Sequence, residues 1–235
     1  MSGYRDQVLV FDADDTLWEN NVLFERVIDG FLDWVSTPED RIRVRALLDG
    51  IEAENAALLG YGAEVFRRSL GDCLGRLHGR TPAAAELERI EDLLLPLTDR
   101  GVELIEGVAE TLAVLAGRHR LLMLTKGDPV EQQRKVDASR IAHHFGSVHI
   151  VPEKDVDTYR RLTADLGLAV DRTWMIGNSP KSDILPAGRA GLRTVFIPHE
   201  HTWVLEHEEF GADGADGADG ATLQLRGFGE LLEHF

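Results

Sequence analysis

Short apolar runs alternate with longer amphipathic stretches over much of this chain. A short continuous apolar run is typical of a strand that is buried on both faces of a sheet. The intervening stretches have the length of crossover helices, and this rhythm indicates a doubly covered parallel sheet. The predicted strands are Val8 to Phe11, Leu121 to Leu124, Val148 to Val151, Thr173 to Ile176, Thr194 to Ile197 and a final edge strand at Thr222 to Leu225.

Between the first predicted strand and Arg120 the apolar residues follow only helical spacing, as in the runs Leu23 to Leu32 and Val65 to Leu77. Thr37-Pro38 and Thr81-Pro82 are predicted helix starts, with threonine as N-cap and proline in the first turn. We therefore predict a discontinuous α/β core of residues 1–19 and 97–235. An inserted domain of about four helices, residues 20–96, follows the first strand and would form a lid.

Composition narrows the class of protein. The chain has 235 residues, of which 43% are hydrophobic, so it can bury a sizeable core. A single cysteine, Cys73, excludes an internal disulfide framework, and no signal peptide or membrane-length apolar run is present, so we expect a cytoplasmic protein. The formal net charge of −16 argues against nucleic acid and anionic membranes as partners.

Three Gly-Ala-Asp triplets occupy Gly211 to Asp219. Their glycine content and lack of proline predict a flexible loop rather than a collagen-like segment. The alternative is calcium binding by Asp213, Asp216 and Asp219, but the repeat is shorter than known calcium-binding glycine–aspartate repeats. A short terminal helix is predicted from Gly229 to Phe235.

Three carboxylates, those of Asp12, Asp14 and Asp15, follow the first predicted strand within four positions. Like charges this close repel one another, so a cation or a charge-bearing reaction between them would explain the cluster. An acidic turn in which an aspartate caps the next segment explains it equally well. In open α/β sheets, ligands bind at the carboxyl ends of the strands, which is where these residues lie.

Further polar groups follow the later predicted strands. A helix pattern starts at Pro129 and is preceded by Thr125, Lys126 and Gly127. This segment is either an anion-binding site at the helix N-terminus or an ordinary N-cap. Lys154 follows the next predicted strand. Its ammonium either reaches the strand ends where the three aspartates lie or is a solvated surface charge. The turn after Ile176 contains Asn178 and Asp183.

The order Asp-x-Asp-x-Thr, strand-Thr, Lys and Gly-Asn-x-x-x-x-Asp closely resembles the haloacid dehalogenase (HAD) superfamily of phosphohydrolases. The resemblance covers Val8 to Pro198. It implies an α/β fold with a Rossmann-like parallel sheet core, and the inserted helices resemble the helical cap that this superfamily carries between its first and second motifs. The activity it implies is Mg²⁺-dependent hydrolysis of a small soluble phosphate monoester through an aspartyl-phosphate intermediate.

The resemblance also assigns roles to matching residues. Asp12 would be the nucleophile and Asp14 the general acid and base. Mg²⁺ would be held by Asp12, the backbone carbonyl of Asp14 and Asp183, with Asn178 in or beside the ligand set. The remaining residues would bind or position the phosphate: Thr16, Thr125, Lys126, Gly127 and Lys154.

Asn178 departs from the superfamily pattern, which usually has aspartate there, so weaker metal binding is expected, with Lys126 adding a compensating positive charge. Asp14 favours phosphate esters because dehalogenase-like members lack this second aspartate. Two alternatives stay open: a phosphoglucomutase-like phosphomutase and a catalytically silent phosphate-binding protein. The sequence leaves the substrate and the oligomeric state open. The candidate substrate contacts are Gly60-Tyr61-Gly62, Trp18, Glu19 and Asn20, and for each of them a role in core packing or as a hinge is the alternative. His199 and His201 belong either to a metal site or to a surface loop.

Overall fold

The computed structural model describes residues 4–98, 101–208 and 221–235. The chain forms two compact units, one of residues 1–21 and 102–235 and the other of residues 22–101. The Gly-Ala-Asp triplets, and with them the calcium alternative at Asp213, Asp216 and Asp219, lie outside the described residues.

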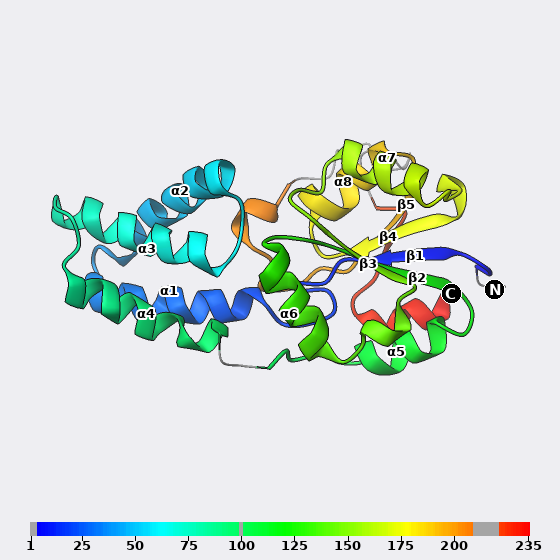
Figure 1. Cartoon of the computed structure of the whole chain (residues 1–235), viewed down its shortest axis with the longest axis horizontal. Helices are drawn as coiled ribbons and strands as arrows, with labels where there is room; N and C mark the ends of the chain where they lie inside the picture. The colour runs from blue at the N-terminus through cyan, green and yellow to red at the C-terminus, as the bar shows by residue number, and fades with distance from the viewer. Residues whose placement is uncertain (1–3, 99–100, 209–220) are drawn as a thin grey trace. The chain divides into compact units, whose positions relative to one another are not determined.

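The first unit is built on a six-stranded sheet with the order β3-β2-β1-β4-β5-β6 (Figure 1). Every neighbouring pair of strands is parallel, which confirms the predicted α/β class. Several strands begin one residue before their predicted start or extend past their predicted end, because the ladder continues beyond the strictly apolar positions. The strands are β1 (Val8–Phe11), β2 (Arg120–Lys126), β3 (Ser147–Val151), β4 (Thr173–Gly177), β5 (Arg193–Phe196) and β6 (Leu223–Gln224).

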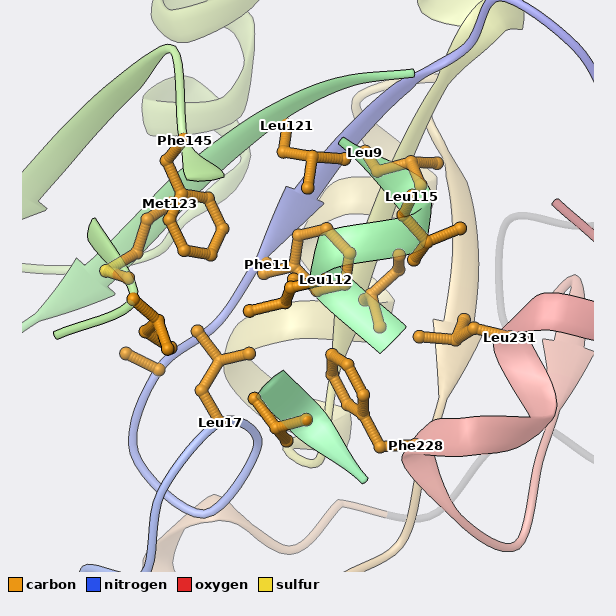
Figure 2. Packing of buried hydrophobic residues seen from close by; sticks show 14 of the residues in the cluster. Leu9, Phe11, Leu17, Leu112, Leu115, Leu121, Met123, Phe145, Phe228 and Leu231 are labelled. Carbon is orange, nitrogen blue, oxygen red and sulfur yellow. The ribbon is translucent and has the colours of Figure 1, made fainter. Parts of the chain in front are cut away.

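Both faces of this sheet are covered by helices. Successive side chains of β1 point to opposite faces: Leu9 and Phe11 belong to one buried cluster, and Val10 belongs to another. Leu9 and Phe11 pack with residues of α5 (Val108–Leu115) and of the 3₁₀ segment η5 (Phe228–Glu233), as Figure 2 shows. Val10 packs with residues of α7 (Val156–Asp165) and α8 (Leu185–Arg189). The central strands are therefore fixed by apolar burial from both sides.

The second unit contains four helices in its described residues, α1 (Asn21–Val35, beginning at the unit boundary), α2 (Arg41–Leu59), α3 (Ala63–His78) and α4 (Ala84–Thr98). Its buried cluster includes Phe31, Leu48, Ile51 and Leu70 and is separate from the two clusters around the sheet. A helical unit with a core of its own thus interrupts the α/β unit. None of the helices in the described part of the chain combines the length and the apolar composition of a membrane span.

Two predicted helix starts, Pro38 and Pro82, are wrong by three and two residues. Asp40 accepts hydrogen bonds from the backbone N–H and the hydroxyl of Thr37, and this turn delays α2 until Arg41. The N–H of Ala83 donates to the carboxylate of Glu86 at 2.7 Å, so α4 starts at Ala84. In both places a carboxylate three residues further on accepts the N–H of a residue that precedes the helix, as the acidic residue of a capping box does.

Glu52 is a buried carboxyl group within the second unit, and its Oε2 has no hydrogen-bond partner among the described residues. Burial, reinforced by the charge of Asp49, raises the pKa of Glu52 from 4.5 to about 8. The folded chain therefore retains a proton that the unfolded chain has lost, so stability falls as the pH rises from 4.5 to about 8.

We expect Glu52→Gln to remove this loss, because an amide does not ionise. Each pH unit in the window costs about 1.4 kcal/mol, so the variant should be more stable than the parent by roughly 1–3 kcal/mol near the upper end. Urea unfolding at several pH values measures the effect, with Glu54→Gln at an exposed position of the same helix as control. Parallel pH profiles for parent and Glu52→Gln would contradict the prediction.

Candidate active site

The functional side chains predicted from the sequence follow four neighbouring strands. Strands β3, β2, β1 and β4 are adjacent and parallel, so their carboxyl ends lie along one edge of the sheet. The ladder extends past β1, since the N–H of Asp12 donates to the carbonyl of Ile176 at 2.9 Å. This edge brings together Asp12, Thr125, Lys154 and Asp183.

Lys154 lies between two carboxylates. Its Nζ donates to Oδ1 of Asp12 and, at 2.8 Å, to Oδ1 of Asp183. All three side chains are buried; Lys154 is 3% exposed and Asp183 is fully buried. One ammonium thus faces two carboxylates, which leaves a net negative charge in a region shielded from water.

This arrangement shifts the ionisation of the groups. Burial, together with the charge of Asp183, raises the pKa of Asp12 to about 7 against the opposing effect of Lys154. Burial alone would lower the pKa of Lys154, but the two carboxylates raise it well above its usual value, so the ammonium keeps its proton. The cluster therefore holds one permanent cation and an aspartate that is costly to ionise without a further positive charge.

Thr16 connects the first loop to the turn after β4. Its hydroxyl lies 3.0 Å from Oδ2 of Asp12 and 3.1 Å from Oδ1 of Asn178. Nδ2 of Asn178 donates to the hydroxyl of Thr202 at 2.9 Å. The amide of Asn178 thus uses both its acceptor and its donor, a combination that an aspartate could not supply.

Asp183 is held by the turn that precedes it. Its Oδ2 accepts the backbone N–H of Ser179 at 3.0 Å, and its own N–H donates to the carbonyl of Ser179. Gly177, the last residue of β4, makes room for it, since a Cβ there would lie 2.2 Å from Oδ2 of Asp183. The glycine is therefore required by the position of the carboxylate.

We expect Gly177→Ala to displace Asp183, to destabilise the protein by about 1–3 kcal/mol and to weaken any metal binding that depends on this carboxylate. Thermal unfolding and a metal titration measure the two effects. Gly50→Ala is the matched control, because a Cβ at this exposed helical position meets no atom within 4 Å. That change should stabilise α2 slightly. Equal behaviour of the two variants would contradict the proposed steric cause.

Three predicted phosphate ligands lie at the end of β2, and each has different contacts in the structure. Thr125 is buried, and its Oγ1 lies 2.6 Å from Nε2 of Gln132. The ammonium of Lys126 donates to Glu206 at 2.5 Å and to Ser182 at 2.8 Å. The N–H of Gly127 donates to the carbonyl of Val151. Phosphate contacts by Lys126 and Gly127 therefore stay predictions.

Asp14 is surrounded by donors whose contact with it could not be predicted from the sequence. Its Oδ1 accepts from the indole of Trp18 at 2.7 Å, and its Oδ2 accepts from Nε2 of Gln132 at 3.0 Å. Nζ of Lys135 lies 3.1 and 3.0 Å from the two carboxylate oxygens. Gln132 and Lys135 are on α6 (Pro129–Ser139), which begins with Asp128 as its N-cap.

His199 faces the same loop from the far end of the chain. Its Nε2 lies 3.3 Å from Glu19, and its Nδ1 lies 3.8 Å from Asp15. Asp15 itself caps the following segment by accepting the N–H groups of Asn20 and Asn21. The ligand atoms of Asp15, Glu19 and His199 lie within 4.8 Å of one another, a spacing compatible with a metal ion. The alternative in which an aspartate caps the next segment therefore holds for Asp15, which accepts two backbone N–H groups, but not for Asp12, which contacts Lys154.

The cluster around Asp12 has the donor chemistry of a Mg²⁺ site. Carboxylate oxygens of Asp12 and Asp183 and the amide oxygen of Asn178 belong to one connected group of contacts, and all are the hard oxygen ligands that Mg²⁺ prefers. Burial and, after it, the charge of Asp183 raise the pKa of Asp12, so its ionised form is disfavoured, and a bound divalent cation would offset this effect. The residues present therefore fit the ion that the resemblance implies.

Comparison with known proteins decides the family. A family model described as haloacid dehalogenase-like hydrolase matches residues 7–191, which include every residue of the cluster described above. The chain belongs to this family.

Among curated proteins, a phosphoserine phosphatase of Thermus thermophilus is 32% identical over 157 residues, which are 63% of this chain and 59% of that protein. The chain thus matches less than two thirds of the length of this relative. A haloacid dehalogenase-like hydrolase of Xanthomonas campestris has a similar structure, with 28% identity, a TM-score of 0.76 and coverage of 91% of this chain and 90% of that one.

The fold also occurs in a haloacid dehalogenase. The L-2-haloacid dehalogenase of Xanthobacter autotrophicus has a TM-score of 0.64 at 17% identity, over 97% of both chains. The family therefore establishes a hydrolase fold, and the bond that is broken has to be argued from the residues of the site.

Proposed function

We propose that this haloacid dehalogenase-like hydrolase is a Mg²⁺-dependent phosphatase that hydrolyses a small phosphate monoester through an aspartyl-phosphate. The observation that carries the proposal is the buried group of Asp12, Lys154 and Asp183 with Asp14 two residues beyond the nucleophile position. The similarity to a phosphoserine phosphatase supports the same chemistry.

In the first step, a carboxylate oxygen of Asp12 attacks phosphorus, and the bond between phosphorus and the ester oxygen breaks. The departing alkoxide takes a proton from the carboxyl group of Asp14 and leaves as an alcohol. Lys154 stabilises the charge that Asp12 and the phosphoryl group bring together. Thr125 would hold a phosphoryl oxygen with its hydroxyl.

In the second step, a water molecule attacks the phosphorus of the aspartyl-phosphate and gives a proton to Asp14. The bond between phosphorus and Asp12 breaks, inorganic phosphate leaves, and the carboxylate of Asp12 and the protonated Asp14 are regenerated. A dehalogenase needs no proton for its halide leaving group, so an acid at position 14 favours an oxygen leaving group.

Mg²⁺ held by Asp12, the backbone carbonyl of Asp14, Asp183 and Asn178 would supply Lewis-acid stabilisation of the phosphoryl charge. Residues 20–96 are proposed to act as a helical cap that selects the substrate. The cap belongs to this proposal because a helical unit with its own core is inserted directly after the first acidic loop.

The test is a panel of p-nitrophenyl phosphate, phosphoserine, sugar phosphates, nucleoside monophosphates and a 2-haloacid, each assayed with and without Mg²⁺. We expect Mg²⁺-dependent release of phosphate. In heavy-oxygen water, a phosphatase places the label in phosphate, whereas hydrolysis of a carbon ester at the carbonyl places it in Asp12. Halide release, or bisphosphate-dependent isomerisation of a sugar phosphate without net hydrolysis, would overturn the proposal.

A further inference from the structure

Four donor contacts from three residues fix both oxygens of Asp14, and one of these residues, Trp18, is near it in the sequence. Two of these residues, Gln132 and Lys135, are three positions apart and therefore lie on the same side of α6. Gln132 is buried, and the side chain of Lys135 is only 14% exposed. A lysine and a glutamine on a helix are usually solvated, so burial of both is the unexpected feature.

We propose that Gln132 and Lys135 are positioning residues for the reaction. They hold the carboxyl group of Asp14 at a fixed distance from the hydroxyl of Thr125. This inference rests on the proposed function, because it assigns these two residues to the acid–base step of that reaction. Lys135 contacts both oxygens of Asp14 and also donates to Oδ1 of Asn20 at 2.8 Å. The ammonium thus fixes the carboxylate against the segment that follows the acidic loop.

Gln132 connects Asp14 to the strand end that carries Thr125. Its Nε2 lies 3.0 Å from Oδ2 of Asp14, 2.6 Å from Oγ1 of Thr125 and 3.0 Å from the carbonyl of Lys126. One buried amide thereby sets the separation between the proposed acid–base group and the proposed phosphate ligand. General acid–base catalysis depends on such placement, since displacement by about 1 Å costs on the order of 10²-fold in rate.

Gly127 explains why Gln132 can occupy this position. It has a φ of +140°, and a Cβ on it would lie 3.2 Å from Cγ of Gln132. A side chain at this position would be strained and would press on the amide that bridges Asp14 and Thr125. The resemblance implied that Gly127 binds the phosphate; in the structure, its lack of a side chain also leaves room for the bridging glutamine.

The first experiment compares Lys135→Met and Gln132→Met with two controls at exposed positions, Gln133→Met on the same helix and Arg140→Met at its C-cap. We expect kcat to fall by about 10- to 100-fold in the first pair with KM changed less than about threefold, and both controls to match the parent. Lys135→Arg should restore most of kcat, because a cation again reaches Asp14. Unchanged kcat, or a rise in KM at constant kcat, would overturn the positioning role.

A double-mutant cycle distinguishes positioning from a general structural effect. If Lys135 acts through Asp14, Lys135→Met should cost little further activity in an Asp14→Asn background, whereas independent roles would give multiplied losses. Multiplied losses would overturn the inference.

The same cycle in urea unfolding does not depend on the activity. Coupling between Asp14→Asn and Lys135→Met in the unfolding equilibrium is expected whatever the substrate, and strict additivity would overturn the contact. A parent protein that releases no phosphate from any ester would overturn the proposed function and, with it, the assignment of Gln132 and Lys135 to the reaction. Failure of Lys135→Met to lower kcat in an active enzyme would overturn this inference alone.

Discussion

Asp12→Asn is expected to abolish turnover, lowering kcat by at least about 10⁴-fold while the fold is kept. The amide is nearly isosteric with the carboxylate but cannot attack phosphorus. Thr16 and Lys154 contact different oxygens of Asp12, so the amide oxygen can still accept the ammonium of Lys154 while the amide NH2 donates to the hydroxyl of Thr16. Steady-state release of phosphate measures the effect, and circular dichroism with thermal unfolding checks the fold.

The matched control for this substitution is Asp155→Asn. Asp155 is an exposed N-cap of α7, and its carboxylate accepts the N–H of Thr158 at 2.7 Å. Asparagine is also a good N-cap, so this variant should keep its activity. Substantial hydrolysis by Asp12→Asn, with the aspartyl-phosphate still detected by mass spectrometry, would remove Asp12 from the role of nucleophile.

The sequence predicted the sheet well because its strands are buried on both faces. Such strands are continuous apolar runs, and β1 coincides with the predicted Val8 to Phe11. The carboxyl ends of parallel strands meet at one edge, so Asp12, Lys154 and Asp183 could be expected together although Asp12 and Lys154 are 142 residues apart. Residues that are far apart in the sequence are thus brought close together by the parallel topology of the sheet.

The partners of the polar side chains could not be predicted in the same way. Lys126 was expected beside the phosphate, but its ammonium donates to Glu206, which lies 80 residues away in the sequence, in a short 3₁₀ segment. Gln132 and Lys135 were missed because polar residues on a helix usually face solvent. The local sequence offered two signals: the spacing of three residues between Gln132 and Lys135, and a glycine, Gly127, before the helix. Neither identifies Asp14 as the acceptor.

Lys154→Met should be the most destabilising of the substitutions considered, at about 3–5 kcal/mol, because it removes the cation that faces two buried carboxylates. Methionine has a similar volume, so the loss is chiefly electrostatic. Urea unfolding measures it, with Lys181→Met as the control, since Lys181 is exposed and its ammonium donates to the uncharged carbonyl of Leu205.

Two further measurements test this electrostatic cause. Adding Asp183→Asn to Lys154→Met should recover part of the lost stability, because one of the two buried charges is then neutral. Mg²⁺ should stabilise Lys154→Met more than it stabilises the parent, since a divalent cation bound by Asp12 and Asp183 offsets the charge that the lysine no longer balances. A loss of stability that neither Asp183→Asn nor Mg²⁺ reduces would mean that Lys154 supports the fold by packing, and the buried charge balance at the strand ends would need another explanation.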